Sequence, residues 1–138
     1  MGTKLRAHLA VLDYTQFAYS QEMKRAPMTV VETERFLNDA QPLMPESERV
    51  ELIVFVAANP EAGDVIPETG GVRKLRWGLR GRDKRGGARV VYYYHSERLP
   101  VFLLAACAKN ERANLSKAER NAMRKLVPIL AEGYPRQE

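Results

Sequence analysis

The sequence predicts a single α+β domain that combines helical segments with a small antiparallel sheet. The chain has 138 residues, of which 45% are hydrophobic, and a chain of this size and composition buries one modest core. Three apolar runs follow one another closely, over residues 72–79, 88–95 and 99–109. The turns between them are too short for a parallel crossover, so these runs are predicted to form an antiparallel meander. A capped, amphipathic segment over residues 115–130 then predicts a final helix.

The N-terminal part of the chain differs from the rest. Residues 1–27 show no clean helical or alternating period and end in a basic stretch followed by a proline. We therefore predict that they form a dispensable extension, and that Met28 is a candidate for the natural first residue. The folded domain is predicted to span residues 28–134.

Three elements are predicted before the meander. Residues 28–33 are rich in β-branched side chains and predict a strand, and residues 34–43 predict a short helix that breaks near Pro42. Residues 45–60 predict a second helix, because a proline and two acids stand at its beginning, where the helix dipole favours anions. The apolar run inside this segment, taken alone, could equally form a buried strand.

The last two elements carry more specific signals. The run over residues 99–109 is almost wholly apolar, which predicts a strand in the middle of the sheet with both faces covered. Ser116 and Glu119 have the spacing of a capping box at the start of the final helix. Pro128 is expected to kink or end this helix. Its buried face is predicted to be an apolar stripe of Leu115, Ala122, Leu126 and Ile129.

Composition narrows the possible classes of protein and site. The chain has no run of about 18 apolar residues, and its N-terminus lacks the pattern of a secretory signal, so we expect a cytoplasmic protein without a membrane partner. The single cysteine, Cys107, cannot form an internal disulfide and is expected to be a buried, inert thiol. Two distant histidines and scattered acids do not form a metal-binding cluster, so no metal or cofactor is expected.

Charge is divided unevenly along the chain. Between Glu32 and Glu68, nine acidic residues and two arginines give a net charge of −7. Between Arg73 and Arg98, nine basic residues and two acids give a net charge of +7. Seven of these nine bases are arginines, whose planar fork suits phosphate oxygens. The basic block could simply form a solvated surface, but it also has the electrostatic footprint of a nucleic-acid-binding protein.

Alternation along the predicted strands sorts the cations by face. Trp77 and Arg73 fall on one face of the first meander strand, whereas Lys74 and Arg76 fall on the other. If Arg89 of the next strand pairs near Lys74 or Arg76, like charges lie at cross-strand distance, which is destabilising unless an anion occupies the space. The pattern therefore predicts a phosphate-binding surface. Tyrosines 92–94 could stack on RNA bases beside it, or could simply pack within the strand.

Three blocks of the sequence resemble a known family. They read GDVIPETGGVRKLRW, GGARVVYYY and VFLLAACAKNERANLSKAERNAMRKLV. Across residues 28–127 the chain is similar to the RelE/HigB-like toxins of bacterial type II toxin–antitoxin systems, particularly the HigB branch. The resemblance implies a small RelE-like fold and a ribonuclease that cleaves messenger RNA at the ribosomal A site. It also implies a cognate HigA-like antitoxin, often with a helix-turn-helix domain. The toxin would contact operator DNA only through this antitoxin.

The resemblance also implies roles for particular residues. Lys74 and Arg76 match a basic pair of the family, and Arg89 matches an arginine that holds the scissile phosphate in relatives. The segment over residues 109–112 matches one that carries further catalytic groups. The predicted catalytic residues are Lys74, Arg76, Arg89, Glu111 and Arg112. The predicted RNA-binding residues are Arg73, Arg80, Arg82, Lys84, Arg85, Tyr93 and Lys109.

The sequence does not identify which residues act as the general acid and the general base. Relatives carry a tyrosine shortly after the charged segment, where this chain has Ser116 inside a cap; Glu111 and Lys74 are candidates to move a proton, and His95 is a weaker one. Clustered cations suit metal-free cleavage, in which a ribose 2′-hydroxyl attacks its own phosphate. Two other functions also stay open. The protein could be a non-catalytic nucleic-acid or protein-binding module of the same fold, or a ParE-like toxin that acts on DNA gyrase.

Overall fold

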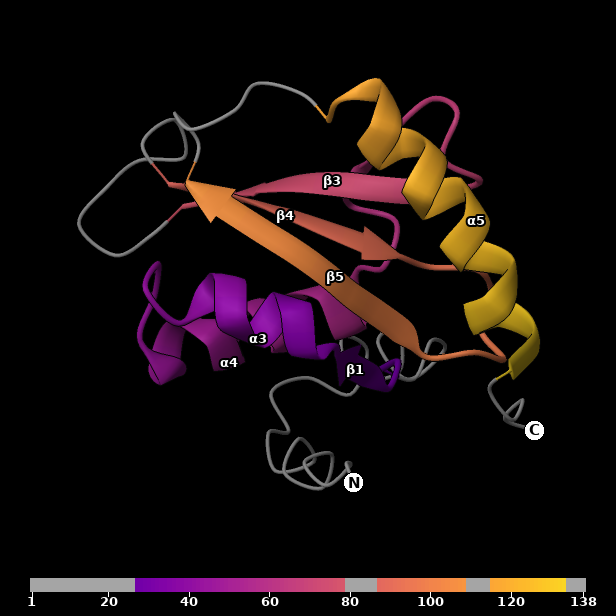
Figure 1. The fold of residues 1–138 in the computed structure, drawn as a ribbon. Coiled ribbons are helices and arrows are strands. Elements are labelled where there is room, and N and C mark those ends of the chain that lie inside the picture. The colour runs from indigo at the N-terminus through magenta and orange to yellow at the C-terminus, as the bar shows by residue number, and fades with distance from the viewer. Residues whose placement is uncertain (1–26, 79–86, 109–114, 134–138) are drawn as a thin grey trace.

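The computed structural model describes residues 27–78, 87–108 and 115–133 (Figure 1). The elements follow in the order β1 Val30–Glu32, α3 Glu34–Ala40, α4 Glu46–Ala58, β2 Asp64–Val65, β3 Val72–Trp77, β4 Ala88–Tyr93, β5 Val101–Ala108 and α5 Lys117–Gly133. The α+β class and the order of strand, two helices, meander and final helix are confirmed. Of the predicted N-terminal extension, residues 1–26 lie outside the described residues.

One mixed sheet organises the fold. Its strand order is β1-β5-β4-β3-β2, and the pairs from β2 to β5 are antiparallel as predicted for the meander. The sequence predicted an antiparallel sheet, but β1 lies parallel to its neighbour β5, with Val30 opposite Val101. This pairing is possible because both helices and three strands separate the two segments along the chain. The short strand β2 was not predicted.

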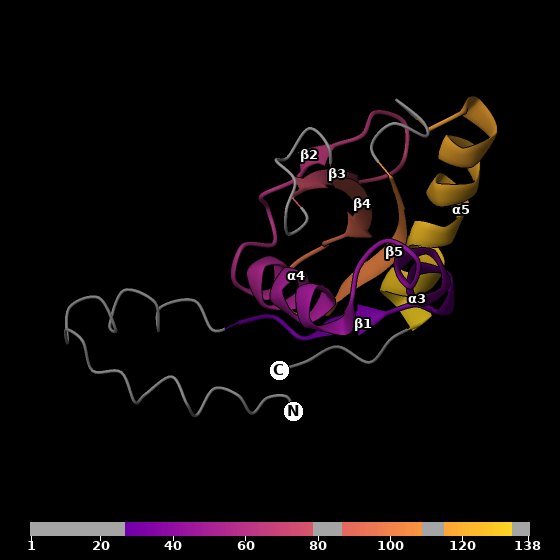
Figure 2. The same cartoon turned by 90° about the vertical axis from the view of Figure 1, so that its left-hand side faces the viewer.

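Helices cover both faces of the sheet. Phe36 of α3 and Leu52 and Val56 of α4 pack in one buried cluster against one face. Met123 and Val127 of α5 pack in a second cluster against the other face. Figure 2 shows α4 and α5 on opposite sides of the strands. In the part of the chain that the structure describes, no helix is long and apolar enough to cross a membrane.

The α4 segment is a helix, as its proline and acids predicted. Its buried residues Leu52 and Val56 are four apart, and the intervening Val54 is 56% exposed. This spacing places the buried side chains on one face of a helix, whereas a strand would bury alternate residues. The flanking residues therefore decided between helix and strand where the apolar run could not.

The start of α5 was predicted correctly, but its buried face was not, and of the two effects expected of Pro128 the helix does not end there. Ser116 and Glu119 exchange two hydrogen bonds, of 2.8 and 3.1 Å, which confirms the capping box. The predicted stripe is wrong, because Ile129 and Ala122 are exposed and the buried side chains are Met123 and Val127; of its members only Leu115 and Leu126 pack against the core. Pro128 lies inside the helix, which continues to Gly133 because Leu130 and Ala131 still pack on the second cluster.

The central position of β5 was predicted correctly. It lies between β1 and β4, with Leu103 in one cluster and Phe102 in the other. Its pairing with β4 skips Leu104, since Val91 faces Ala105 and Tyr92 faces Leu103. Such a bulge shifts the alternation of the strand by one residue.

Candidate active site

Three cations of the meander lie on the same face of the sheet. Arg76 is directly opposite Arg89 in the antiparallel β3–β4 pair, and Lys74 lies two residues along from Arg76. All three therefore point to the side of the sheet that α5 covers. The predicted juxtaposition of like charges is confirmed. Gly87 allows the close approach of the two strands here, because a Cβ at this position would overlap the carbonyl oxygen of Trp77.

An acid that the sequence did not single out lies beside these cations. Asp64 of β2 is paired with Lys74 of β3, so the two side chains share a face. A hollow of about 400 Å³ is lined by Asp64, Lys74, Leu75, Arg76, Arg89 and Ala62. The short strand β2 thus brings a carboxylate to the rim of a basic site.

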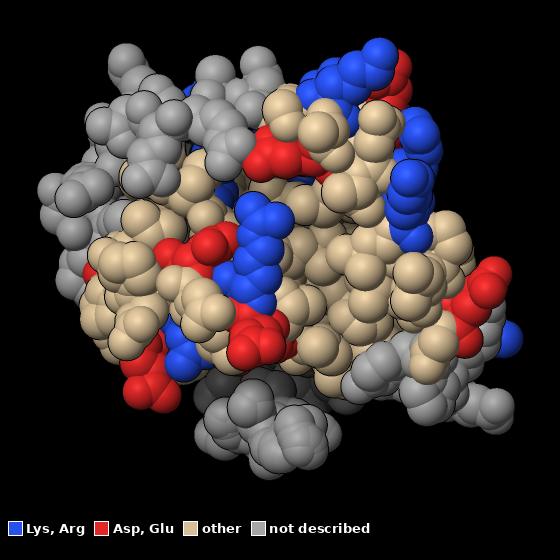
Figure 3. Space-filling model, viewed as in Figure 1, with Lys and Arg blue, Asp and Glu red and all other residues tan. Residues whose placement is uncertain are grey.

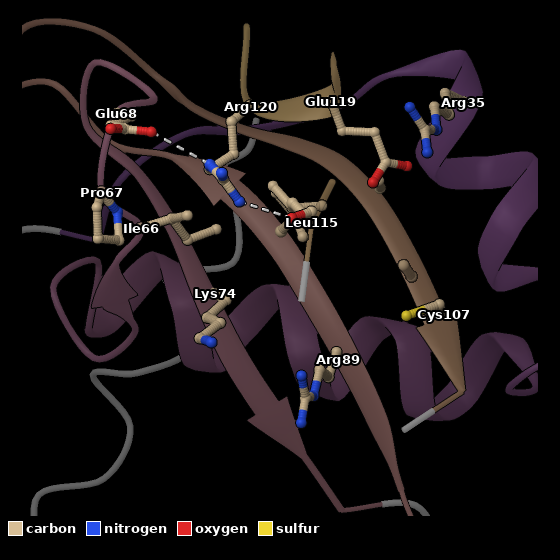
Figure 4. Close-up of a pocket in the computed structure, with 13 residues that line it drawn as sticks. Arg35, Ile66, Pro67, Glu68, Lys74, Arg89, Cys107, Leu115, Glu119 and Arg120 are labelled. Carbon is tan, nitrogen blue, oxygen red and sulfur yellow. Dashed lines mark hydrogen bonds and ion pairs between the residues drawn. The ribbon is translucent and has the colours of Figure 1, made fainter. Parts of the chain in front are cut away.

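A second hollow extends from the same cations toward α5. It has a volume of about 370 Å³, and Lys74 and Arg89 line it from the sheet (Figure 4). Glu119 and Arg120 line it from α5, and Arg35 lines it from α3. Clefts of about 300–1,000 Å³ are typical of small-ligand sites. Lys74 and Arg89 therefore lie where the two hollows meet.

Cys107 also lines the second hollow. It is paired with Arg89 across β4 and β5, and the bulge at Leu104 sets the face on which it lies. The thiol was expected to be buried, but the residue is partly exposed. The expectation failed because the apolar run of β5 ends at the rim of a cavity, where its last residues are not covered.

Two of the predicted RNA-binding residues lie elsewhere. Arg73 is on the opposite face of β3, where its Nη1 donates to the carbonyl oxygens of Gly63 at 2.8 Å and Glu61 at 3.3 Å. Tyr93 is only 3% exposed beneath α5, and its hydroxyl lies 3.1 Å from Nδ1 of His95. Burial raises the pKa of Tyr93 above its ordinary value. Neither side chain faces the two hollows, and the ring of Tyr93 presents no open surface for a base.

The other predicted site residues lie outside the described residues. They belong to segments 79–86 and 109–114 and comprise Arg80, Arg82, Lys84, Arg85, Lys109, Glu111 and Arg112. The strand ends that flank these segments are described, and Ala88 at the start of β4 pairs with both Trp77 and Ala108. Both segments therefore join the sheet at the end where Arg76 and Arg89 lie.

The face of the molecule that carries α3 and α5 has no single sign of charge. Figure 3 shows basic and acidic side chains interspersed over the face that carries α3 and α5. In the described segments, no group of three His, Cys, Asp or Glu side chains could hold a metal ion. Within the sheet, Arg76 and Arg89 are direct partners on one face of β3 and β4.

Comparison with known proteins gives the family. The family model described as the RelE toxin of the RelE/RelB toxin–antitoxin system matches residues 55–134, which is more than half of the chain. The chain belongs to this family. The matched range contains β2 to β5 and α5, and so contains both hollows except for Arg35. As a RelE-type toxin, the protein has a cognate antitoxin as its implied partner.

A solved structure is also similar to this chain. It is a double arginine-to-alanine variant of E. coli toxin RelE in the free state. The two are 20% identical, the similarity covers 75% of this chain and 99% of that chain, and the TM-score is 0.48.

Proposed function

We propose that this RelE-type toxin belongs to the HigB branch and is an endoribonuclease that cleaves translated messenger RNA on the ribosome and so inhibits translation. The observation that carries the proposal is the direct pairing of Arg76 with Arg89, beside Lys74, over a hollow that could take a nucleotide. Like charges at this distance destabilise a sheet unless an anion neutralises them. RNA brings such an anion as a regularly spaced phosphate.

The reaction that suits these groups needs no metal ion. The ribose 2′-hydroxyl attacks the adjacent phosphorus, the bond to the 5′-oxygen of the next nucleotide breaks, and a 2′,3′-cyclic phosphate and a 5′-hydroxyl remain. Arg89 and Arg76 would hold the non-bridging oxygens and stabilise the charge that develops on the phosphorane. Lys74, close to both, would orient the phosphate or give a proton to the leaving oxygen.

The base that accepts the 2′-hydroxyl proton has two candidates. Glu111, proposed from the family resemblance together with Arg112 and Lys109, belongs to the segment that follows β5 at the basic end of the sheet. Asp64 is the second candidate, because it shares a face and a hollow with Lys74 and Arg89. Cleavage rates of Glu111→Gln and Asp64→Asn across pH would separate the two, since only loss of the base removes the limb of the profile that reports its titration.

Partners and location follow from the proposed activity. The toxin would act in the cytoplasm on ribosome-bound messenger RNA, within a domain spanning residues 28–134. A HigA-like antitoxin would neutralise it with an acidic segment placed over the meander cations, and operator DNA would be reached only through that antitoxin. A complex that resists mutation of Arg76 and Arg89 but not of remote residues would contradict this arrangement.

Induced expression in bacteria tests the function. We expect growth arrest, relief by the neighbouring antitoxin gene, and codon-linked cuts in translated messages on primer extension. Arg89→Ala should abolish both arrest and cuts, whereas Arg98→Ala, an exposed arginine beyond the other end of β4, should abolish neither. Arrest with DNA damage and uncut messages would instead indicate a ParE-like toxin, and RNA binding without arrest or cuts would indicate a non-catalytic module.

A further inference from the structure

One arginine of α5 reaches the same hollow as the sheet cations. Arg120 lies in the first turn of α5, and its backbone N–H donates to the carbonyl oxygen of Ser116 at 2.9 Å. Its guanidinium lines the hollow that Lys74 and Arg89 line from the sheet (Figure 4). The site therefore has a basic group on the helix side as well as on the sheet side.

Two partners from different elements hold the Arg120 side chain. Its Nη1 donates to the carbonyl oxygen of Leu115 at 2.8 Å, and its Nε lies 3.5 Å from Oε1 of Glu68. These contacts engage two of the three guanidinium nitrogens, and Nη2 carries two further N–H donors. An arginine held in this way is fixed in direction and still has donors for an anion.

The backbone at Glu68 is shaped to supply one of these partners. Glu68 has a φ of 66°, a left-handed conformation that is uncommon for a residue with a side chain. The next residue, Thr69, is fully buried, and its hydroxyl donates to the carbonyl oxygen of Ile66 at 2.7 Å and accepts from the N–H of Val72 at 3.0 Å. The turn thus keeps Glu68 in an unfavourable conformation, and its carboxylate at the rim of the hollow.

Stability alone gives a weak reason for this arrangement. The Glu68 side chain is 66% exposed, and an ion pair in such a position contributes little to folding. Unfavourable backbone conformations cluster where a binding site requires them. Glu68 lines the hollow that Lys74 and Arg89 also line, so its conformation is the one expected if this hollow binds a ligand.

We propose that Arg120 binds a phosphate of the RNA chain next to the one held by Arg89, and that Glu68 and the Leu115 carbonyl position its guanidinium. The inference rests on the proposed ribonuclease function and adds a second anion contact to it. Arg89 would act on the reacting phosphate, and Arg120 on its neighbour. The two arginines should therefore affect different kinetic constants.

Binding of single-stranded RNA tests the contact without cleavage. The probe is a short single-stranded RNA with 2′-O-methyl riboses, which cannot attack the phosphate, and its Kd is measured over a range of salt concentrations. Arg120→Ala should raise the Kd about 10-fold and reduce the slope of log Kd against log salt by about 0.7, the value for one lost contact to a single strand. Arg120→Lys should keep the slope. Arg124→Ala removes an exposed arginine one turn further along α5 and should change neither quantity.

Cleavage kinetics and Glu68 give a second measurement. In a translation-dependent cleavage assay, Arg120→Ala should raise KM with kcat nearly unchanged, whereas Arg89→Ala should lower kcat. Glu68→Gln should raise KM less than Arg120→Ala does, because Arg120 keeps its charge but loses one anchor. In the double variant, Glu68→Gln should add little further effect.

The possible outcomes are distinguishable. An unchanged salt slope in Arg120→Ala, with a lowered melting temperature, would give Arg120 a purely structural role and overturn the inference. If Arg120→Ala does not fold, an unchanged KM in Glu68→Gln overturns it instead. If the native toxin binds the RNA but does not cleave translated messages, the proposed ribonuclease function fails, and the salt slope still decides the Arg120 contact. A native toxin that does not bind the RNA overturns the inference itself.

Discussion

The two faces of β3 give neighbouring cations different roles. On the face toward α4, the Arg73 guanidinium donates to two backbone carbonyls of the loop before β2. On the face toward α5, Lys74 and Arg76 meet Arg89 over the two hollows. The residues are consecutive or nearly so, and they have the same charge. What separates them is the group that each one faces. Arg73 faces the backbone carbonyls to which its Nη1 donates, whereas Arg76 and Arg89 face each other across the strand pair, which favours an anion between them.

The adjacent tyrosines of β4 repeat the contrast in part. The hydroxyl of Tyr92 accepts from the N–H of Gly63 and donates to the carbonyl of Pro60, both at 2.8 Å. Tyr92 and Arg73 thus both anchor the loop before β2 to the sheet. Tyr93 is buried on the other face beneath α5. On the α4 face, Arg73 and Tyr92 therefore donate to carbonyls of one loop, whereas Lys74, Arg76 and Arg89 lie on the α5 face.

The largest expected effect comes from Arg89 on the α5 face. Arg89→Ala should lower kcat for translation-dependent cleavage by about 10²-fold or more, because it removes a charge donor to the phosphorane. The free energy of unfolding, measured by urea denaturation, should change much less. A large loss of stability with a normal kcat would reverse the roles assigned to the two faces.

The corresponding change on the α4 face is Arg73→Met. It should lower the free energy of unfolding by about 2 kcal/mol, since it removes charged hydrogen bonds to two carbonyls while keeping much of the apolar stem. Urea denaturation gives this value, and kcat/KM for cleavage should stay near that of the native toxin. A fall in RNA affinity with unchanged stability would instead support the predicted role of Arg73 in RNA binding.

Local patterns predicted the face on which each cation lies, because alternation depends only on neighbours in the chain, but they did not separate the roles, since Arg73 was placed among the RNA-binding residues. Alternation placed Arg73 and Lys74 on opposite faces, and two closely spaced strands placed Arg76 near Arg89. The residues that complete the hollows could not be found in this way. Arg35, Asp64, Glu68 and Arg120 come from four separate segments that only the tertiary fold brings together.

The errors have related causes. The parallel pairing of β1 with β5 joins segments about 70 residues apart in sequence, and no local pattern encodes such a pair. In α5, the stripe was chosen from hydrophobicity alone, whereas the sheet selects the face that carries Met123 and Val127. Tyr93 was predicted from its chemistry to contact RNA, and the sequence did not show that α5 would bury its ring.

A smaller effect is expected from Tyr92→Phe. The variant loses two buried hydrogen bonds of the α4 face and should lower the free energy of unfolding by about 1–2 kcal/mol, with cleavage unchanged. Tyr93→Phe has one partner to lose, in His95, and should cost less. Equal losses in the two variants would show that these hydrogen bonds do not distinguish the faces.

Tyr92 also gives a prediction for the stability of the protein at high pH. Burial raises the pKa of Tyr92 above its ordinary value of 10.0, although the hydrogen bond from Gly63 opposes this shift. The folded state therefore favours the protonated phenol, so this contribution to stability is complete below pH 10 and is lost as the pH rises through the raised pKa. Unfolding measured above pH 10 should show a shallower decline of stability in Tyr92→Phe than in the native toxin. An identical decline would place the titration elsewhere.

The smallest effect should have the opposite sign to that of Arg73→Met. Arg76→Gln removes one of two like charges that lie directly opposite each other, so the free energy of unfolding should rise by about 0.2–1 kcal/mol. The gain should shrink as salt is added, because Arg76 is exposed and its repulsion is screened. Cleavage should nevertheless fall. Two arginines three residues apart on β3 would then change stability in opposite directions, as expected if one face is built for the fold and the other for an anion. A loss of stability in Arg76→Gln would show that these cations are not in conflict without RNA, and would remove the main reason for placing a phosphate between them.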